Sequence, residues 1–286
     1  MLRTNPAMAR LLGRTDLDGR DVLDLADPTD APVLRSALDA MADGVEVDRF
    51  EVRLLGPGGQ RLRCACAASV VPAGDGGAEA VLLVEDVTER HEAETLLAHQ
   101  ARHDALTGLP NRTLLTERLG ALLGPGVRAD SRVGVVYLDL DGFKAVNDAE
   151  GHAVGDGLLR EVARRLGAAV RPGDTVARLG GDELVVVCPS LAGGADLALV
   201  ARRVVAELGA PYDPPARHHR VTVSAGTALA DHGDDPAALL ARADAAMYAA
   251  KRAGGDRWCS ADPSPGGPGL VVPVEMEPPV TRGARP

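Results

Sequence analysis

Apolar residues recur along the chain with two different periods, and these periods predict where helices and strands lie. Helical spacing indicates a short helix at Met8–Leu12 and a longer one at Pro32–Met41. Three segments with alternating apolar residues follow, separated by glycine-rich turns at 56–59 and 74–77. The predicted strands are Val47–Leu55, Leu62–Val71 and Ala80–Val87. Residues 1–88 are therefore expected to form a small α+β domain, in which helices cover one face of a single sheet.

A charged stretch, residues 89–103, comes after this first domain. Thr88 is a residue type that often caps the start of a helix, so a helix is predicted here. The apolar residues of the stretch do not follow heptad spacing, which argues against a long coiled coil. We interpret it as a helical signalling linker, although a plain connector fits the same pattern.

Residues 104–260 predict a second, larger domain. The predicted helices are Arg112–Leu123, Val154–Val170, Ala195–Leu208 and Pro236–Arg252, and the predicted strands are Arg132–Leu140, Val176–Leu179, Leu184–Cys188, Arg220–Leu229 and Arg257–Cys259. The apolar run at 133–138 indicates a strand that is buried on both faces. Together these elements predict an α/β (α+β) sandwich, in which helices flank a central sheet. Residues 261–286 are rich in Pro and Gly and predict a disordered tail.

Composition and charge narrow the classes of function. Two domains suit a chain of 286 residues, and 45% hydrophobic with 25% charged residues is ordinary for a globular protein. The net charge is −10 and no Lys/Arg-rich run occurs, so we expect no nucleic-acid partner. No apolar run approaches the length that spans a bilayer, and the N-terminus does not resemble a signal peptide. We therefore expect a cytoplasmic protein without membrane insertion.

Cys64 and Cys66 lie two residues apart on a predicted strand and therefore share one face of it. Such a pair could bind a metal, but no further Cys or His stands nearby in the sequence to complete a site. We favour buried, apolar cysteines.

Carboxylates stand at two places where chain geometry could bring them together. Asp139 lies at the end of the buried strand, with Lys144 shortly after it, and Asp182 and Glu183 lie at a predicted hairpin tip. If the two strands are neighbours, the three carboxylates converge, and such oxygen ligands suit Mg²⁺ together with substrate phosphates. Neighbouring glycines let the backbone approach a phosphate. The pattern predicts a metal-dependent nucleotide site; two solvated acidic turns are the alternative.

Five sequence blocks, in order, resemble the GGDEF family, whose members are diguanylate cyclases. They are Asp104–Arg112, Asp139–Asp148 with Gly151-His152 and Gly155-Asp156, Arg178–Leu184, Val223–Gly226, and Ala243–Lys251. The resemblance covers residues 104–259, more than half of the chain. It implies the condensation of two GTP into cyclic di-GMP with release of two pyrophosphates. Because the product joins two substrates, it also implies a homodimer.

The resemblance assigns the metal and the proton transfer to the carboxylates. Asp139 and the backbone of Leu140 would hold Mg²⁺ (or Mn²⁺), with Asp182 as a further ligand. Glu183 would be either a ligand of a second metal or part of the proton-accepting pair. A metal lowers the pKa of the attacking ribose hydroxyl, and a carboxylate takes its proton. We favour Asp182 for that proton, with Glu183 as the alternative.

Other residues of the same blocks would bind the nucleotide. Lys144 would neutralise charge on the phosphates, the turn Gly142-Phe143 would offer backbone N–H groups, and Lys251 would reach the terminal phosphates.

The guanine base would be read by Asn147 and Asp156. A carboxylate at Asp156 accepts from guanine N1–H and N2–H₂, a donor pair that adenine lacks, so this residue favours GTP. His152 either contacts the nucleotide or packs structurally.

Arg171 and Asp174 form an RxxD pattern just before the Gly180-Gly181 pair. This is where the family has its product-inhibition site, so the two residues would bind cyclic di-GMP as an allosteric inhibitor. The alternative is that they only cap the helix that ends near Val170.

Two positions depart from the family's usual pattern. Leu184 stands where Phe is usual, and an apolar strand residue is tolerable there. Gly255 stands where an Arg that binds phosphate is usual. Both departures favour the rival interpretation, a degenerate cyclase that binds GTP or cyclic di-GMP as a receptor. Another rival, a cyclase that makes a mixed cyclic dinucleotide, is opposed by Asp156.

The N-terminal segment resembles a PAS domain at its early helix, Asn5–Gly13, and at its exit, Asp86–Arg90. The strand that normally precedes the early helix is not recognised before Asn5, so we expect either a shortened chain or an incomplete domain here. Without a His before His91, a His-ligated haem is excluded, and the single aromatic residue Phe50 argues against an aromatic cofactor pocket. A regulatory role through dimerisation or a small ligand is expected.

Overall fold

The computed structural model describes residues 3–43, 45, 47–72, 78–124, 132–212 and 220–262. The chain divides into two compact units, Met1–Ala98 and His99–Pro286, and each is described by itself. The division falls inside the predicted linker. The predicted turn at 74–77 and the predicted tail beyond residue 262 lie outside the described residues.

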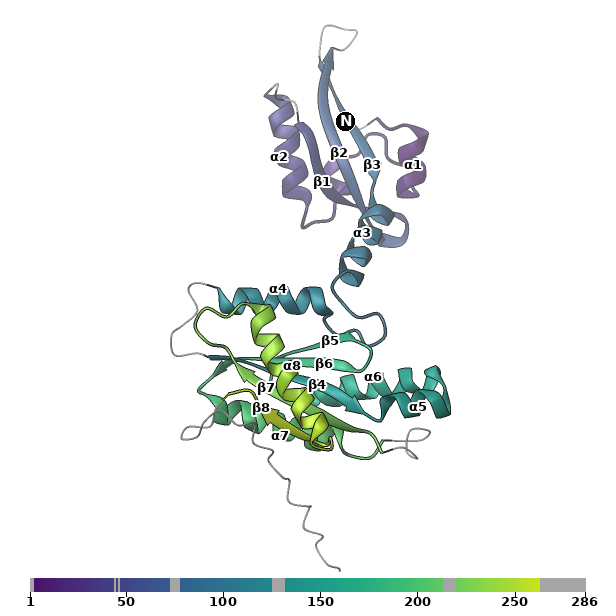
Figure 1. The fold of residues 1–286 in the computed structure, drawn as a ribbon. Helices are drawn as coiled ribbons and strands as arrows, with labels where there is room; N and C mark the ends of the chain where they lie inside the picture. The colour runs from purple at the N-terminus through teal and green to yellow at the C-terminus, as the bar shows by residue number, and fades with distance from the viewer. Residues whose placement is uncertain are drawn as a thin grey trace, which may run out of the picture. The chain divides into compact units, whose positions relative to one another are not determined.

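The first unit is a three-stranded antiparallel sheet with order β1-β2-β3, and helices cover one of its faces (Figure 1). Its elements are α1 (Pro6–Leu12), η1 (Val22–Leu25), α2 (Ala31–Ala42), β1 (Val47–Leu55), η2 (Pro57–Gly59), β2 (Arg61–Pro72) and β3 (Ala78–Asp86). Leu12 of α1 and Leu34 of α2 pack with Cys64 and Cys66 of β2 in its core. Both cysteines are free and buried, as expected, and burial raises the pKa of Cys64 to about 12 and that of Cys66 to about 11.

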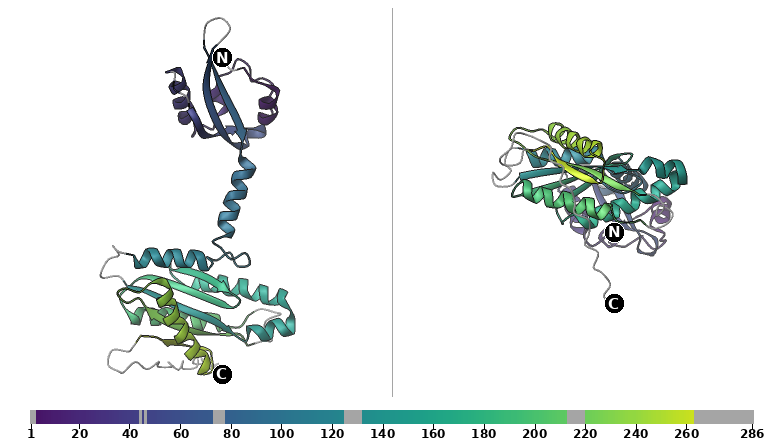
Figure 2. Two further views of the ribbon diagram at one scale, coloured as in Figure 1. Left: turned by 45° about the horizontal axis from the view of Figure 1, so that its top comes forward. Right: turned by 60° about the horizontal axis from the view of Figure 1, so that its bottom comes forward.

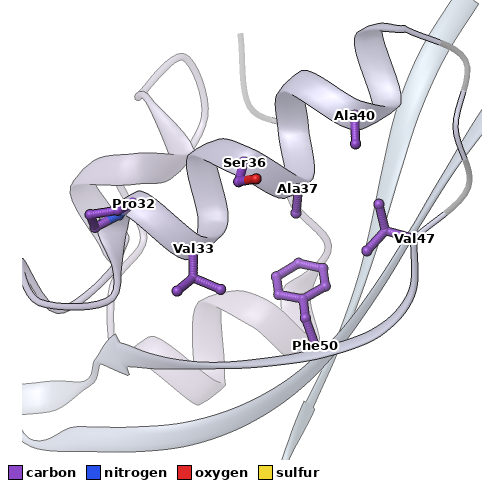
Figure 3. A pocket seen from close by; sticks show the side chains of 7 residues that line it. All are labelled: Pro32, Val33, Ser36, Ala37, Ala40, Val47 and Phe50. Carbon is purple, nitrogen blue, oxygen red and sulfur yellow. The ribbon is translucent and has the colours of Figure 1, made fainter.

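A shallow apolar pocket of about 510 Å³ opens between α2 and β1 (Figure 3). The Phe50 side chain points from β1 toward Val33 and Ala37 of α2, and Ser36 supplies the hydroxyl of the lining. The sole aromatic residue of this unit therefore lies at a surface groove rather than deep in the core.

Helix α3 (Thr88–Gln100) follows β3 and buries none of its residues. The prediction that Thr88 caps this helix was wrong. The Thr88 hydroxyl accepts the backbone N–H of Arg63 at 2.8 Å, while the Asp86 carboxylate accepts the backbone N–H of Thr88 at 2.9 Å. Asp86 therefore caps the first turn, because the threonine hydroxyl is used by the neighbouring strand β2.

The second unit is a five-stranded sheet with order β5-β6-β4-β7-β8. Its elements are α4 (Arg112–Leu123), β4 (Arg132–Asp141), α5 (Phe143–Glu150), α6 (His152–Ala169), β5 (Thr175–Gly180), β6 (Glu183–Leu191), α7 (Gly194–Leu208), β7 (Thr222–Leu229), α8 (Pro236–Arg252) and β8 (Arg257–Ser260). Helices α6 and α7 pack on one face, and α4 and α8 pack on the other (Figures 1 and 2). The predicted sandwich and element order are confirmed, and the central strand β4 is buried from Val133 to Leu140.

Helix α8 lies unusually close to strand β7. A Cβ atom on Gly226 would lie 2.0 Å from the carbonyl oxygen of Ala243 and 2.1 Å from the backbone nitrogen of Met247. Only a glycine permits this approach, because backbone atoms cannot move aside as a flexible side chain can. This close packing fixes the position of α8 on the sheet, and therefore also the position of Lys251 in its last turn.

No helix in the described ranges is long and apolar enough to cross a membrane.

Candidate active site

The predicted carboxylates lie on neighbouring strands, where β4 ends beside the hairpin of β5 and β6. Asp139 of β4 is paired in register with Glu183 of β6 on one side and with Ser224 of β7 on the other. The hairpin turns at Gly181-Asp182, between the paired residues Gly180 and Glu183. The strands are therefore neighbours, as the convergence of the carboxylates required.

Asp139 is the buried acid of this group, with its side chain 12% exposed. Burial raises its pKa, and the carboxylates of Asp182 and Asp141 add to the rise, which a hydrogen bond from Lys251 opposes. The Lys251 ammonium, near the end of α8, lies 2.6 Å from Asp139 Oδ1. Burial lowers the pKa of Lys251, but the hydrogen bond to Asp139 and the charges of Asp139 and Asp182 outweigh that effect and raise it.

The sequence contains only two lysines, Lys144 and Lys251, and both were predicted to bind phosphate. In the structure, Lys144 is exposed on α5, whereas the Lys251 ammonium is ion-paired to the Asp139 carboxylate.

The two acids of the hairpin differ in how they are held. The Tyr137 hydroxyl donates to Glu183 Oε2 at 3.1 Å. Burial raises the pKa of Tyr137 to about 12, and the negative charge of Glu183 contributes. Within the described parts of the chain no hydrogen bond reaches the Asp182 carboxylate, which is therefore the freer of the two acids.

The residues that could hold a divalent cation offer hard oxygen donors. Asp139 and Asp182 supply carboxylates, while Leu140 buries its side chain in the core and leaves only its carbonyl for the site. No three His, Cys, Asp or Glu side chains of the described residues are gathered closely enough to ligate a metal. The donor chemistry nevertheless fits Mg²⁺ or Mn²⁺. The carboxylates here repel one another, and they already attract one positive charge, the Lys251 ammonium.

The predicted phosphate turn has the backbone geometry that glycine provides. Gly142 has φ of +82°, and a Cβ atom there would lie 3.1 Å from the carbonyl oxygen of Arg220. Phe143 begins α5 and buries its ring in the core, so this residue can offer only its backbone to a ligand.

The predicted base-reading residues come together where α5 packs on α6. A Cβ atom on Gly155 would lie 1.9 Å from Asn147 Oδ1, so the glycine makes room for the amide of Asn147. Asp156 follows Gly155 directly and is half-buried, while His152 is exposed in the first turn of α6. The structure thus brings Asn147 and Asp156 to one helix junction and leaves His152 on the surface.

Arg178 holds the hairpin tip, a role that the sequence reasoning missed. Its guanidinium donates to the carbonyl oxygen of Gly181 at 2.7 and 3.0 Å and to both carboxylate oxygens of Asp104 at 2.9 and 3.0 Å. Burial acts to raise the pKa of Asp104, but hydrogen bonds from Thr107 and Arg178 lower it overall. The opening block of the domain is thereby tied to the hairpin of β5 and β6. The sequence signal for this contact is that Asp104 and Arg178 each begin a block that resembles the family.

Asp141 is a second residue that was missed. Its carboxylate accepts the hydroxyls of Thr222 at 2.9 Å and Ser224 at 2.7 Å, and the backbone N–H of Asp256 at 3.0 Å. A Cβ atom on Gly255, where φ is +70°, would lie 2.8 Å from Asp141 Oδ2. Gly255 therefore lets the loop after α8 close on this carboxylate.

Gly255 stands where the family usually has an arginine, and Arg257 is two residues further along the chain. Arg257 turns its Nε back to donate to the carbonyl oxygen of Gly255 at 3.0 Å.

Arg171 and Asp174 form an ion pair at the far end of the hairpin strands. Arg171 Nε lies 3.1 Å from Asp174 Oδ1, and the Arg171 guanidinium also donates to the carbonyl oxygens of Pro189 and Ser190. The Asp174 side chain is fully buried, and that of Arg171 is 47% exposed. The pair thus links the start of β5 to the end of β6, and one side of the arginine faces solvent.

Residues 101–257 match the family model described as "Diguanylate cyclase, GGDEF domain". The chain belongs to the GGDEF family. Residues 1–89 match the family model of a PAS domain.

Two curated relatives from Pseudomonas aeruginosa cover the GGDEF region. The chain is 45% identical over 173 residues to the bifunctional diguanylate cyclase/cyclic di-GMP phosphodiesterase MucR, covering 60% of this chain and 25% of the relative. It is 44% identical over 160 residues to the diguanylate cyclase TpbB, covering 54% of this chain and 36% of the relative. The chain therefore spans about a quarter to a third of the length of these relatives.

Solved structures support the same fold. The coiled coil and GGDEF domain of DgcB from Caulobacter crescentus, in complex with c-di-GMP, has a TM-score of 0.55 at 28% identity, covering 61% of this chain and 93% of that one. The GGDEF domain of TpbB has a TM-score of 0.53 at 40% identity, covering 56% and 94%.

Proposed function

We propose that this GGDEF protein is a diguanylate cyclase that condenses two GTP into cyclic di-GMP and releases two pyrophosphates. The observation that carries the proposal is the register of the sheet, which sets Asp139 beside Glu183 and the Asp182 hairpin tip in a chain of this family. The relatives named as diguanylate cyclases support it. We place the activity in the cytoplasm.

The chemistry assigns a proton acceptor to the hairpin. The 3′-oxygen of one GTP forms a bond to the α-phosphorus of the other, the bond to the bridging oxygen breaks, and pyrophosphate leaves. Asp182 takes the hydroxyl proton, since it is the acid without a hydrogen bond among the described residues, whereas Glu183 is held by Tyr137. Glu183 is the alternative acceptor or a ligand of a second cation. The same step, repeated with the roles exchanged, closes the ring.

A divalent cation, Mg²⁺ or Mn²⁺, would be held by Asp139, Asp182 and the Leu140 carbonyl, and when bound it supplies positive charge at the reacting phosphate. Lys144 adds a cation beside the phosphates, and the N–H groups at Gly142-Phe143 orient them. Asn147 and Asp156 select the guanine base.

Two protomers must present one GTP each, so we propose a homodimer regulated by the PAS domain. Helix α3 supports a dimer, because Leu96 and Leu97 are 56% and 64% exposed and the helix buries no residue. A lone helix of this length is only marginally stable in water, and pairing with a second copy would stabilise it.

The proposal is tested by incubating the purified full chain with GTP and Mg²⁺ and analysing the products by mass spectrometry. We expect cyclic di-GMP and pyrophosphate in a 1:2 ratio from the wild type, and no cyclic product from Asp139→Asn. Absence of cyclic di-GMP from a folded wild type that binds GTP would overturn the proposal.

Gly255 favours a second candidate function, a receptor that binds GTP or cyclic di-GMP without turnover. Gly255 lacks the usual phosphate-binding arginine, and Arg257 donates its Nε to the carbonyl oxygen of its own loop. Saturable binding of cyclic di-GMP together with no product formation would support this candidate.

Asp156→Ser is expected to reduce the preference for GTP over ATP by about tenfold or more. A serine cannot present two acceptor oxygens to the guanine edge, and a bidentate base contact is worth about 1–3 kcal/mol. Competition binding of GTP against ATP measures the preference directly, and Arg160→Ala, which changes an exposed side chain one turn further along the same helix, is the comparison. An unchanged GTP/ATP ratio in the serine variant would show that Asp156 does not read the base.

Arg171→Ala is expected to leave the initial rate near that of the wild type but to let product accumulate past the level at which the wild type stalls. Cyclic di-GMP would engage the exposed side of Arg171 through charge-assisted contacts, with the buried Asp174 carboxylate holding the arginine in place, and would restrain β5, which leads into the catalytic hairpin. Progress curves with added cyclic di-GMP measure the effect. If the variant stalls at the same product level as the wild type, the pair has only a structural role. That role would be to link the start of β5 to Pro189 and Ser190 at the end of β6.

A further inference from the structure

The Asp139–Lys251 ion pair joins a residue proposed to hold the cation to a residue proposed to bind phosphate. Lys251 Nζ lies 2.6 Å from Asp139 Oδ1, although the two residues come from β4 and from the last turn of α8. An ammonium this close to Asp139 repels a divalent cation at the same carboxylate, so the two cations compete for it. In this arrangement each residue therefore opposes the proposed role of the other.

The pair has an electrostatic reason. Asp139 is the buried acid of the cluster, and the negative charges of Asp141 and Asp182 act on it. Asp141 is already surrounded by the hydroxyls of Thr222 and Ser224 and by a backbone N–H, all neutral donors. Lys251 is thus the cation that compensates the group, and a buried carboxylate left without one is costly.

The lysine side chain is free to leave while its backbone stays fixed. Ala246, Met247 and Ala250 are buried and anchor α8, and the close contact with Gly226 prevents the helix from sliding on β7. The Lys251 side chain, in contrast, is 46% exposed. A lysine has a flexible stem and three donors, which suits a change of partner from a carboxylate to a phosphate.

We propose that Lys251 compensates Asp139 in the absence of a divalent cation and transfers to the nucleotide phosphates when cation and nucleotide bind together. This inference rests on the proposed function for the phosphate partner. Without nucleotide, a cation must displace the lysine into solvent, so it binds weakly. With nucleotide, the displaced lysine gains the phosphates, so cation and nucleotide each strengthen the binding of the other.

The proposal predicts effects of opposite sign for one substitution. Lys251→Met should bind Mn²⁺ about tenfold or more tightly than the wild type when no nucleotide is present, since one positive charge beside the carboxylates is removed. In the wild type, a non-hydrolysable GTP analogue should increase the affinity for Mn²⁺. In Lys251→Met this increase should be smaller by about tenfold or more. Free Mn²⁺ measured by electron paramagnetic resonance on the full chain gives both values.

Arg252→Met is the matched control, because it removes a positive charge one residue along the same helix. Among the described residues no ion pair or hydrogen bond involves the exposed Arg252 side chain, so its Mn²⁺ affinity should equal that of the wild type. Lys251→Arg keeps the charge and should also bind Mn²⁺ weakly without nucleotide. Lys251→Gln provides a second charge-removing variant, in case Lys251→Met does not fold as judged by its thermal transition.

Mn²⁺ binding by folded Lys251→Met and Lys251→Gln that is no tighter than in the wild type would overturn the proposal. So would a tight site that persists when Asp139→Asn is added to Lys251→Met, because the gain must come from Asp139. The measurement with Mn²⁺ alone does not depend on turnover. If the wild type forms no cyclic di-GMP but Lys251→Met still binds Mn²⁺ more tightly than the wild type, the proposed function is rejected. The exchange of cations at Asp139 is then still supported.

Discussion

Asp182→Ala is expected to lower the rate of cyclic di-GMP formation by at least about a hundredfold, the usual contribution of a positioned general base. The fold should be unaffected, because Asp182 lies in a turn and no hydrogen bond reaches its carboxylate within the described residues. Initial rates of pyrophosphate release and the thermal unfolding transition measure the two effects.

Glu183→Ala is expected to abolish turnover as well, since it removes a carboxylate in register with Asp139. Glu207→Ala, which removes an exposed carboxylate from α7, is the control for loss of charge and should keep the wild-type rate. An unchanged rate in Asp182→Ala or in Glu183→Ala would remove that residue from the mechanism. If Asp182→Ala retains activity and Glu183→Ala does not, the proton acceptor is Glu183.

Gly226→Ala is expected to destabilise the second unit by about 3 kcal/mol or more. The added methyl group would lie 2.0 and 2.1 Å from backbone atoms of α8, so the helix must move away from β7. Movement of α8 would also displace Lys251 from Asp139. Urea denaturation of the purified variant measures the loss, and failure to obtain folded protein is the extreme form of the same result.

Gly157→Ala is the matched control, because the same change is made where nothing lies within 4 Å of the added Cβ atom. Gly157 is exposed in the interior of α6, where alanine is the better helix former, so this variant should be more stable by about 0.5–1 kcal/mol. Equal stability of Gly226→Ala and the wild type would show that α8 is not held against β7 as described.

Local patterns predicted the elements well, because hydrophobic periodicity and turn residues act within a few residues. The strand at Val47–Leu55 has the predicted bounds, and β4 is buried on both faces as its continuous apolar run indicated. Thr88 is the instructive error. Its residue type suits a helix cap, but strand β2 uses its hydroxyl, and a local pattern carries no information about a partner 25 residues away.

The sequence by itself determined the order of the elements, the family and the residues from which the candidate site is built, because each is written in short contiguous blocks. Only the tertiary structure decided how these residues meet. Lys251 contacts Asp139, which lies 112 residues away in the sequence. Arg178 contacts both Asp104, 74 residues away, and Gly181, 3 residues away. Such contacts depend on strand register and on the distance of α8 from the sheet, which the packing of Gly226 sets. Neither quantity is encoded in the residues that make the contact, so both had to be seen in the fold.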